Sequence, residues 1–160
     1  MTQDPAVQRT QDPACRAGPA EPIIVVGVDG SPTSWDAFSW AAGQAMRSNG
    51  KLIVVYVMPL IEPAAALGAP YDYVGVENAR EEIAGELEAE AARRARDIGI
   101  AVSFIRDYGD ATDSLTEIAR TSQANLVVVG RSAKLWHHLA GSLSHRLIYR
   151  KDAPVVVVVP

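Results

Sequence analysis

The sequence is poor in cysteine, in aromatic side chains and in long apolar runs. Its single cysteine, Cys15, cannot form a disulfide within the chain and has no second cysteine at a metal-binding spacing. No apolar stretch approaches the ~20 residues that a membrane-spanning helix needs. The N-terminus lacks the charged-then-apolar pattern of a signal peptide. These absences predict a cytoplasmic protein with no membrane anchor and no disulfide framework.

The chain also lacks an excess of basic charge. Its formal net charge is -4 and its pI is about 5.3, so nucleic acid is not expected as the main partner, because phosphate backbones attract basic surfaces. With 160 residues, of which 48% are hydrophobic, the chain suits one domain with a sizeable core. Such a domain can still hold a small anion through local dipoles.

The first 21 residues differ in composition from the rest. They are rich in Pro, Gln, Asp and Ala, and the pentad T-Q-D-P-A occurs twice. Such a segment cannot bury enough apolar surface to offset the entropy lost on ordering. We therefore predict a disordered tail over residues 1–21 and a folded domain over residues 22–160.

From residue 23 onward, strand-like apolar runs alternate with helix-like segments. The expected strands are 23–28, 52–57, 100–104, 126–129 and 155–159. The expected helices are 32–47, 77–97, 110–122 and 142–150, with a long connection at 59–76. Continuous β-branched runs are typical of parallel strands buried on both faces, and right-handed crossovers place helices on both sides of the sheet. The pattern predicts a Rossmann-like α/β fold, with the alternating third run as an edge strand.

In such a sheet, ligands bind at the carboxyl ends of the strands, where the strand order reverses. Asp29 follows the first strand and Gly130 follows the fourth. A short basic loop comes after Gly130, and Gly141-Ser142 then opens a helix. This succession of strand, glycine loop and helix N-terminus is how α/β folds build an anion site.

Four segments, taken in order, resemble the universal stress protein family. They are P-I-I-V-V-G-V-D-G-S at 22–31, A-N-L-V-V-V-G at 124–130, G-S-L-S at 141–144 and D-A-P-V-V-V-V at 152–158. The resemblance covers residues 22–160. It implies a five-stranded sheet in the order 3-2-1-4-5, of the adenine nucleotide alpha-hydrolase-like type. It also implies a stress-response role and a homodimer that pairs through the fifth strand at 154–159.

Some members of the family bind ATP. Resemblance to this branch implies a site for ATP or another adenine nucleotide, with no metal beyond a nucleotide-bound Mg. Asp29 matches the aspartate that contacts the nucleoside. Val55, or a neighbour, matches the backbone that meets adenine.

The family's phosphate loop is written G-x2-G-x9-G-[S/T]. Gly130 matches its first glycine, and Gly141 with Ser142 matches the closing pair. Ala133 occupies the position of the pattern's second glycine, and seven residues instead of nine separate it from Gly141. A Cβ restricts positive φ and close backbone approach, so weak or absent ATP binding is expected. Arg131, like other cations of the loop, can partly replace lost amides with charge.

Each of these candidates also has a purely structural interpretation. Asp29 and Ser142 are good helix-capping residues, and Gly130 suits a tight loop.

Adjacent His137 and His138 would diverge on a helix, which disfavours a metal site. No catalytic triad or paired carboxylates stand out, so the chain is not expected to be an enzyme. The family resemblance leaves slow ATP hydrolysis as the one open activity. Two functions stay open: a dimeric regulator that binds an adenine nucleotide or a related small anion, and a nucleotide-free member that acts through dimerisation or protein contacts.

Overall fold

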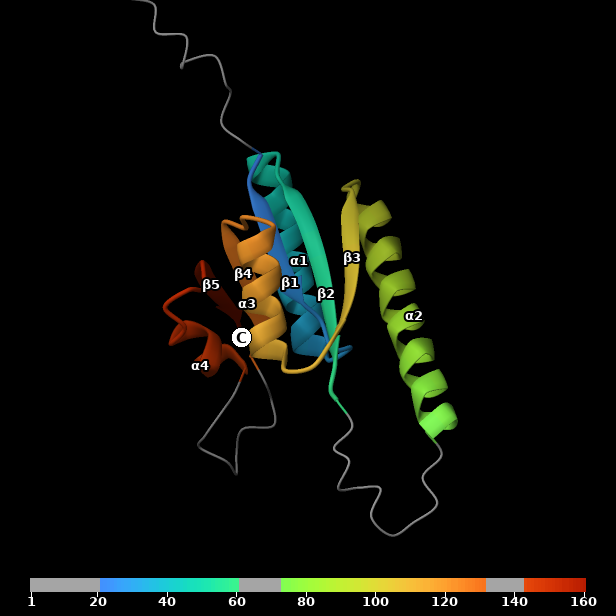
Figure 1. Ribbon diagram of the computed structural model, residues 1–160. Helices are drawn as coiled ribbons and strands as arrows, with labels where there is room; N and C mark the ends of the chain where they lie inside the picture. Colours follow the sequence, from blue (N-terminus) through green and yellow to red (C-terminus); the bar gives the residue numbers. More distant parts are fainter. Residues whose placement is uncertain (1–20, 61–72, 132–142) are drawn as a thin grey trace, which may run out of the picture.

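The computed structural model describes residues 21–60, 73–131 and 143–160. In chain order the elements are β1 (Ile23–Gly27), α1 (Pro32–Ser48), β2 (Lys51–Met58), α2 (Tyr73–Ile98), β3 (Val102–Tyr108), α3 (Ala111–Thr121), β4 (Leu126–Gly130), α4 (Leu143–Ile148) and β5 (Val155–Val159). All strand pairs are parallel, and the order across the sheet is β3-β2-β1-β4-β5 (Figure 1). The predicted α/β class and the strand order implied by the family resemblance are both confirmed.

Two helices pack on each face of the sheet. α1 and α2 cover one face, where the core cluster includes Phe38 and Ala91. α3 and α4 cover the other face, where Leu115 and Leu147 are buried. β1 and β4 lie in the middle and supply side chains to both clusters. Burial on both faces explains why these two strands read as unbroken apolar runs.

Helix α1 begins at the predicted residue, Pro32, and ends at Ser48, one residue beyond the predicted range. Ser31 is the N-cap and its Oγ accepts a hydrogen bond from the Ser34 N–H at 3.2 Å. Pro32 occupies the first turn, where its missing N–H has no intrahelical partner to lose. Asn49 ends the helix in the left-handed conformation, with φ of 49°. The apolar spacing of the helix predicts one inward face, and its members Ala37, Phe38, Ala41, Ala42 and Ala45 are buried, whereas Met46 is 54% exposed.

Strand β3 is shifted relative to its predicted range of 100–104. Ile100 belongs to the turn that closes α2, because its N–H donates to the Ala95 carbonyl at 3.0 Å while Gly99 adopts a φ of 81°. The strand therefore starts at Val102. None of its residues is fully buried and it lies at one end of the sheet, which confirms the expected half-exposed edge strand.

The same strand extends to Tyr108, which pairs with Met58 of β2, and α2 lies against it. Tyr108 Oη donates to the Glu81 carboxylate at 2.9 Å, and Arg106 Nη1 reaches the same carboxylate at 2.9 Å. These contacts pair polar strand residues with the acidic side of α2. Helix α2 itself begins at Tyr73, four residues before its predicted start at Glu77.

Residues 1–20 of the predicted tail and residues 61–72 of the predicted connection lie outside the described residues. Glu21, the last residue of that tail, forms an ion pair with Lys51 at 3.2 Å. Of the helices that the structure describes, none is both long and apolar enough to cross a membrane.

Candidate functional site

The carboxyl ends of β1 and β4 lie side by side at the middle of the sheet. The connection after β1 runs to α1 on one face, and helix α3, which precedes β4, lies on the other face. This is the point where the strand order reverses, and such crevices are the usual ligand sites of open α/β sheets. The structure therefore brings Asp29 and Gly130, the two residues predicted from the ends of β1 and β4, to the same end of the sheet.

Asp29 is exposed and is held by the first turn of α1. Its Oδ1 accepts the Ser31 N–H at 3.0 Å, and its own N–H donates to Ser34 Oγ at 3.3 Å. Partial burial works to raise the pKa of Asp29, but hydrogen bonds from Ser31 and Ser34 outweigh it and leave that pKa below its ordinary value. The side chain is thus an ionised acceptor. Ser31, not Asp29, is the N-cap of the helix.

Gly130 is required by the packing of β4 against α1. A β-carbon at this position would collide with the carbonyl carbon and oxygen of Thr33, and it would lie 2.9 Å from the Ser34 nitrogen. Glycine is the one residue without a β-carbon, so it alone permits this approach of strand to helix. The structure thus gives Gly130 a role that is independent of any ligand.

Val55, the predicted adenine contact, has no free backbone group to offer. It is 1% exposed, and its carbonyl accepts the Val28 N–H at 2.9 Å. The ladder between β1 and β2 ends at the pair of Gly27 and Val55, whereas β2 continues to Met58.

Val57, two residues further along β2, has the unpaired backbone groups that Val55 does not have. The Met58 carbonyl accepts the Gly109 N–H at 2.9 Å, so the backbone of Met58 faces β3. Because these directions alternate along a strand, Val57 turns its N–H and C=O toward the β1 side, past the end of β1. Neither group has a hydrogen-bond partner among the described residues. Sequence reasoning placed the contact only at Val55 or a neighbour, because the length of β1 relative to β2 is not visible in the sequence.

Arg131 follows Gly130 and is exposed, and its N–H donates to the Val159 carbonyl at 2.7 Å. Its side chain is therefore the described cation nearest in sequence to the end of β4. The other predicted loop positions, Ala133, Gly141 and Ser142, lie outside the described residues.

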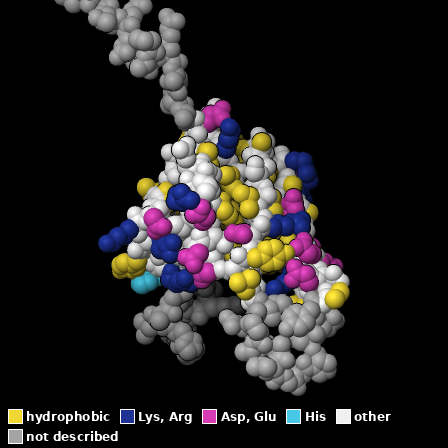
Figure 2. All heavy atoms as spheres, in the orientation of Figure 1, with side chains coloured by type: hydrophobic (Ala, Val, Ile, Leu, Met, Phe, Trp, Pro, Cys, Tyr) yellow, Lys and Arg dark blue, Asp and Glu magenta, His cyan; other side chains and the backbone are white. Residues whose placement is uncertain are grey.

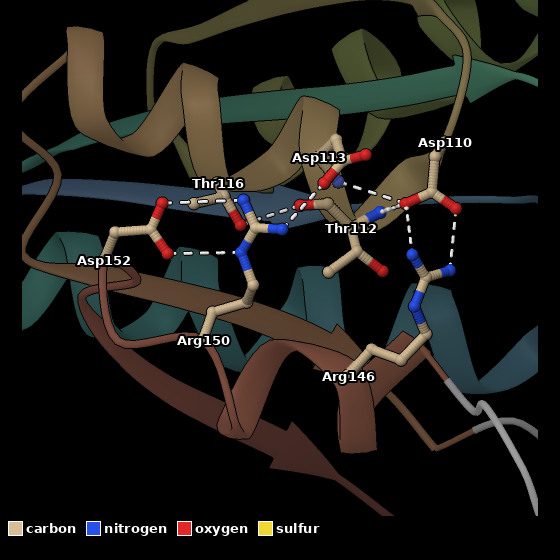
Figure 3. A network of polar contacts seen from close by, with 7 residues as sticks. All are labelled: Asp110, Thr112, Asp113, Thr116, Arg146, Arg150 and Asp152. Carbon is tan, nitrogen blue, oxygen red and sulfur yellow. Dashed lines mark hydrogen bonds and ion pairs between the residues drawn. The ribbon is translucent and has the colours of Figure 1, made fainter.

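A network of ion pairs that sequence reasoning did not find joins α3 to α4. Basic and acidic side chains alternate over these helices (Figure 2), and Figure 3 shows how they connect. Asp110 is the N-cap of α3, and its carboxylate accepts two hydrogen bonds from Arg146, at 2.7 and 3.0 Å. Arg150 bridges Asp113 at 2.9 Å and Asp152 at 3.2 Å. Asp110 and Arg146 are 36 residues apart in sequence, and Asp113 and Arg150 are 37 residues apart, which explains why no local pattern indicates these pairs.

Thr112 lies beside this network (Figure 3). Its side chain is buried, at 1% exposure, and its Oγ1 has no hydrogen-bond partner among the residues that the structure describes. Its backbone carbonyl accepts a hydrogen bond from Thr116 Oγ1 at 2.7 Å. A buried hydroxyl without a partner is unusual in folded proteins.

Comparison with known proteins agrees with this architecture. A protein named universal stress protein from Mycobacterium tuberculosis (strain CDC 1551 / Oshkosh) is 31% identical over 154 residues, which cover 84% of this chain and 47% of that protein. The chain thus spans about half the length of the relatives that it matches.

Solved structures share the fold. A universal stress protein family member from Burkholderia pseudomallei superposes with a TM-score of 0.71 at 24% identity, covering 89% of this chain and 98% of that one. A universal stress protein in complex with cAMP has a TM-score of 0.66 at 26% identity, with 88% and 98% covered. A family member from Arabidopsis thaliana with AMP bound has a TM-score of 0.63 at 19% identity, with 86% and 90% covered.

The model of the universal stress protein family matches residues 22–159, which are nearly all of the predicted folded domain. The chain belongs to the universal stress protein family.

Proposed function

We propose that this protein binds an adenine nucleotide with a single phosphate, such as AMP, at the carboxyl edge of β1, β2 and β4, as a regulatory ligand. The observation that carries the proposal is the free backbone of Val57, which faces past the end of β1. Asp29 lies on that side of the sheet end, two residues beyond Gly27, the last residue of β1. Relatives with the same fold are named as complexes with cAMP and AMP, which supports this class of ligand.

The backbone of Val57 suits adenine better than guanine. Adenine presents an amino donor beside a ring-nitrogen acceptor, whereas guanine presents two acceptors, N7 and O6, at the same edge. A strand edge with one carbonyl and one N–H complements the adenine pattern. A guanine at this position would direct its O6 at the carbonyl and leave it without a donor, which is costly in a closed site.

Asp29 supplies an acceptor for a ribose hydroxyl. An acidic residue in this role is typical of nucleotide sites in α/β folds. Because its pKa is lowered, the carboxylate is ionised near neutral pH and is a poor general base. We therefore propose that the nucleotide is bound without being turned over.

The sequence of the loop after β4 favours a single phosphate. Ala133 replaces a glycine of the family pattern, and the loop is two residues shorter than that pattern. Both changes reduce the number of backbone N–H groups that can approach a phosphate chain. Arg131 provides one cation beside Gly130, which is better matched to a monophosphate than to a triphosphate.

Titration calorimetry with AMP on the wild type and on Asp29→Asn tests this function. Asparagine keeps an acceptor oxygen for the Ser31 N–H, so the turn is retained while the charge is lost. We expect AMP affinity to fall about 10- to 100-fold, as for a hydrogen bond to a charged group. Asp36→Asn, an exposed carboxylate on α1, is the matched control and should bind normally. Equal AMP affinity in Asp29→Asn and the wild type would contradict the proposed site.

We further propose that the protein is a homodimer through β5. The Arg131 N–H donates to the Val159 carbonyl, so Val155, Val157 and Val159 face β4 while Val156 and Val158 turn their backbone groups outward. The other edge, β3, carries Arg106 and Asp107, but β5 consists of five valines. An apolar edge without charge or internal proline invites pairing. When β5 of one copy pairs with β5 of a second copy about a two-fold axis, the unpaired backbone groups of both β5 edges are satisfied.

A nucleotide-free member that acts through this dimer is the second candidate function. The shortened loop at Ala133 favours it, since this departure removes phosphate-binding groups of the family pattern. A dimeric protein that binds neither AMP nor adenosine would support this candidate over the first.

A further inference from the structure

Helix α4 lies beside the free edge of the sheet. It contacts β5 on the sheet and α3 on the same face, and its Leu147 is buried in the core cluster that these elements share. Since β5 is the last strand of the sheet, α4 and β5 together form one outer side of the domain (Figure 1). A chain that pairs with β5 must therefore pass alongside α4.

Two ion pairs show which side of α4 points outward. Arg146 donates to Asp110 at 2.7 and 3.0 Å, and Arg150 donates to Asp113 at 2.9 Å, so both arginines reach α3 (Figure 3). At 3.6 residues per turn, Ile148 lies on the opposite side of the helix from Arg146. Ile148 therefore faces away from α3, toward the free edge of β5.

The outward side of α4 and the neighbouring strand form an apolar edge strip, made of Ile148, Val156 and Val158. Ile148 is 57% exposed although it is a large aliphatic residue. Val156 and Val158 face the same side of the sheet as α4 and are only half-buried, because no strand follows β5 in the sheet. Apolar side chains that gather at one exposed place indicate an interaction surface.

The unpaired backbone of β5 indicates what covers the edge strip. Val156 and Val158 turn their N–H and C=O groups away from β4, and another strand edge is the partner that satisfies such a row. A second copy of this chain carries the same edge. Antiparallel pairing about a two-fold axis perpendicular to the sheet keeps the two α4 helices on one face. Since paired strands lie about 4.8 Å apart, helices over the outer strands approach the roughly 8–10 Å at which helices pack.

We propose that Ile148 is an anchor of the dimer interface: when two copies pair through β5, Ile148 of each copy packs on α4 of the other. The proposal rests on the dimer put forward as part of the proposed function. It predicts that association depends on one side of α4 as well as on the strand. A two-fold interface contains the contact twice, so a single substitution acts twice.

Sedimentation velocity of Ile148→Asp against the wild type tests this anchor. We expect the dissociation constant of the dimer to rise about 100-fold or more, because the variant places a charge in each of two apolar contacts. Ile148→Leu should associate as the wild type does. Met46→Asp is the matched control, since Met46 is 54% exposed and lies on α1, on the other face of the sheet. It should leave association unchanged.

Ile148→Ala removes the apolar contact without adding charge and should weaken association about 10-fold, so it decides the question if the aspartate variant does not fold. Dimers of equal affinity in the wild type and in these variants would overturn the anchor and leave pairing through β5 intact. A less stable Ile148→Asp monomer with unchanged association would show that the protein's own chain covers Ile148, which also overturns it. A wild type that is monomeric at high micromolar concentration would refute the dimer and the anchor together.

Discussion

The carbonyl of Thr33 in the first turn of α1 lies directly against the α-carbon of Gly130 at the end of β4. The two residues cannot move apart without separating α1 from the central strands, which supply much of the core. The contact also places the N-terminus of α1, and with it Asp29, beside the end of β4. Packing and the geometry of the candidate site thus depend on the same glycine.

Gly130→Ala should therefore lower the free energy of unfolding by about 2 kcal/mol, as expected for overpacking against backbone atoms. Denaturant titration measures this loss. Gly85→Ala in α2 is the matched control, because a β-carbon there would meet nothing within 4 Å, and it should stabilise the protein by about 0.5–1 kcal/mol. Equal stability of Gly130→Ala and the wild type would show that the helix and strand can separate at little cost.

Thr112→Val should raise the free energy of unfolding by about 1 kcal/mol, because it removes a buried hydroxyl that has no partner in the described part of the chain. Thermal and denaturant unfolding measure the gain. Thr116→Val is the control: it removes a hydroxyl of similar burial that does donate, to the Thr112 carbonyl, and it should bring no gain. A destabilised Thr112→Val would mean that this hydroxyl is hydrogen-bonded in solution.

The local features of the fold could be predicted because they depend on neighbouring residues. The apolar run at Ile23–Gly27, the cap at Ser31 and the stop at Asn49 each follow from side chains within a few positions. The strand order followed from the resemblance of several motifs taken in order. The start of β3 was predicted two residues too early, because the Ile100 N–H closes α2 and a periodicity argument does not account for such a bond.

The details of the candidate site depend on contacts between distant parts of the chain. The contact between Gly130 and Thr33 and the ion pair between Asp110 and Arg146 join residues that no local pattern relates. Val57 is free only because β1 ends before β2 does, which is a property of the pair of strands. Asp29 could be named in advance because it directly follows an apolar strand.

The hydrogen bonds from Arg146 hold the pKa of Asp110 below its ordinary value of 3.8. A carboxyl whose pKa is lower in the folded state stabilises the fold above its unfolded pKa, and this contribution is lost as the pH falls through its folded pKa. Arg146→Gln should raise the pKa of Asp110 and make the free energy of unfolding less dependent on pH in the acidic range below about pH 5. Carboxyl NMR titration measures the pKa directly. An unshifted Asp110 pKa in the variant would contradict the pairing.

Val158→Pro should convert the dimer to a folded monomer. The Val158 N–H points away from β4, so proline removes a donor of the free edge without removing a hydrogen bond of the ladder. Val157→Pro is the matched comparison and should unfold or strongly destabilise the domain, because the Val157 N–H faces β4. Analytical ultracentrifugation measures the association state. A wild type that is monomeric at high micromolar concentration would contradict the dimer.

The most direct test of the central claim is the response of the Val57 amide to nucleotides in ¹⁵N-resolved NMR spectra. We expect AMP to shift the amide signals of Val57 and Asp29 in a saturable manner, and GMP at the same concentration to leave Val57 unchanged, because guanine lacks the amino donor that the Val57 carbonyl needs. Saturation by AMP with no change at Val57 or Asp29, or an equal response to GMP, would contradict an adenine site at this edge of the sheet.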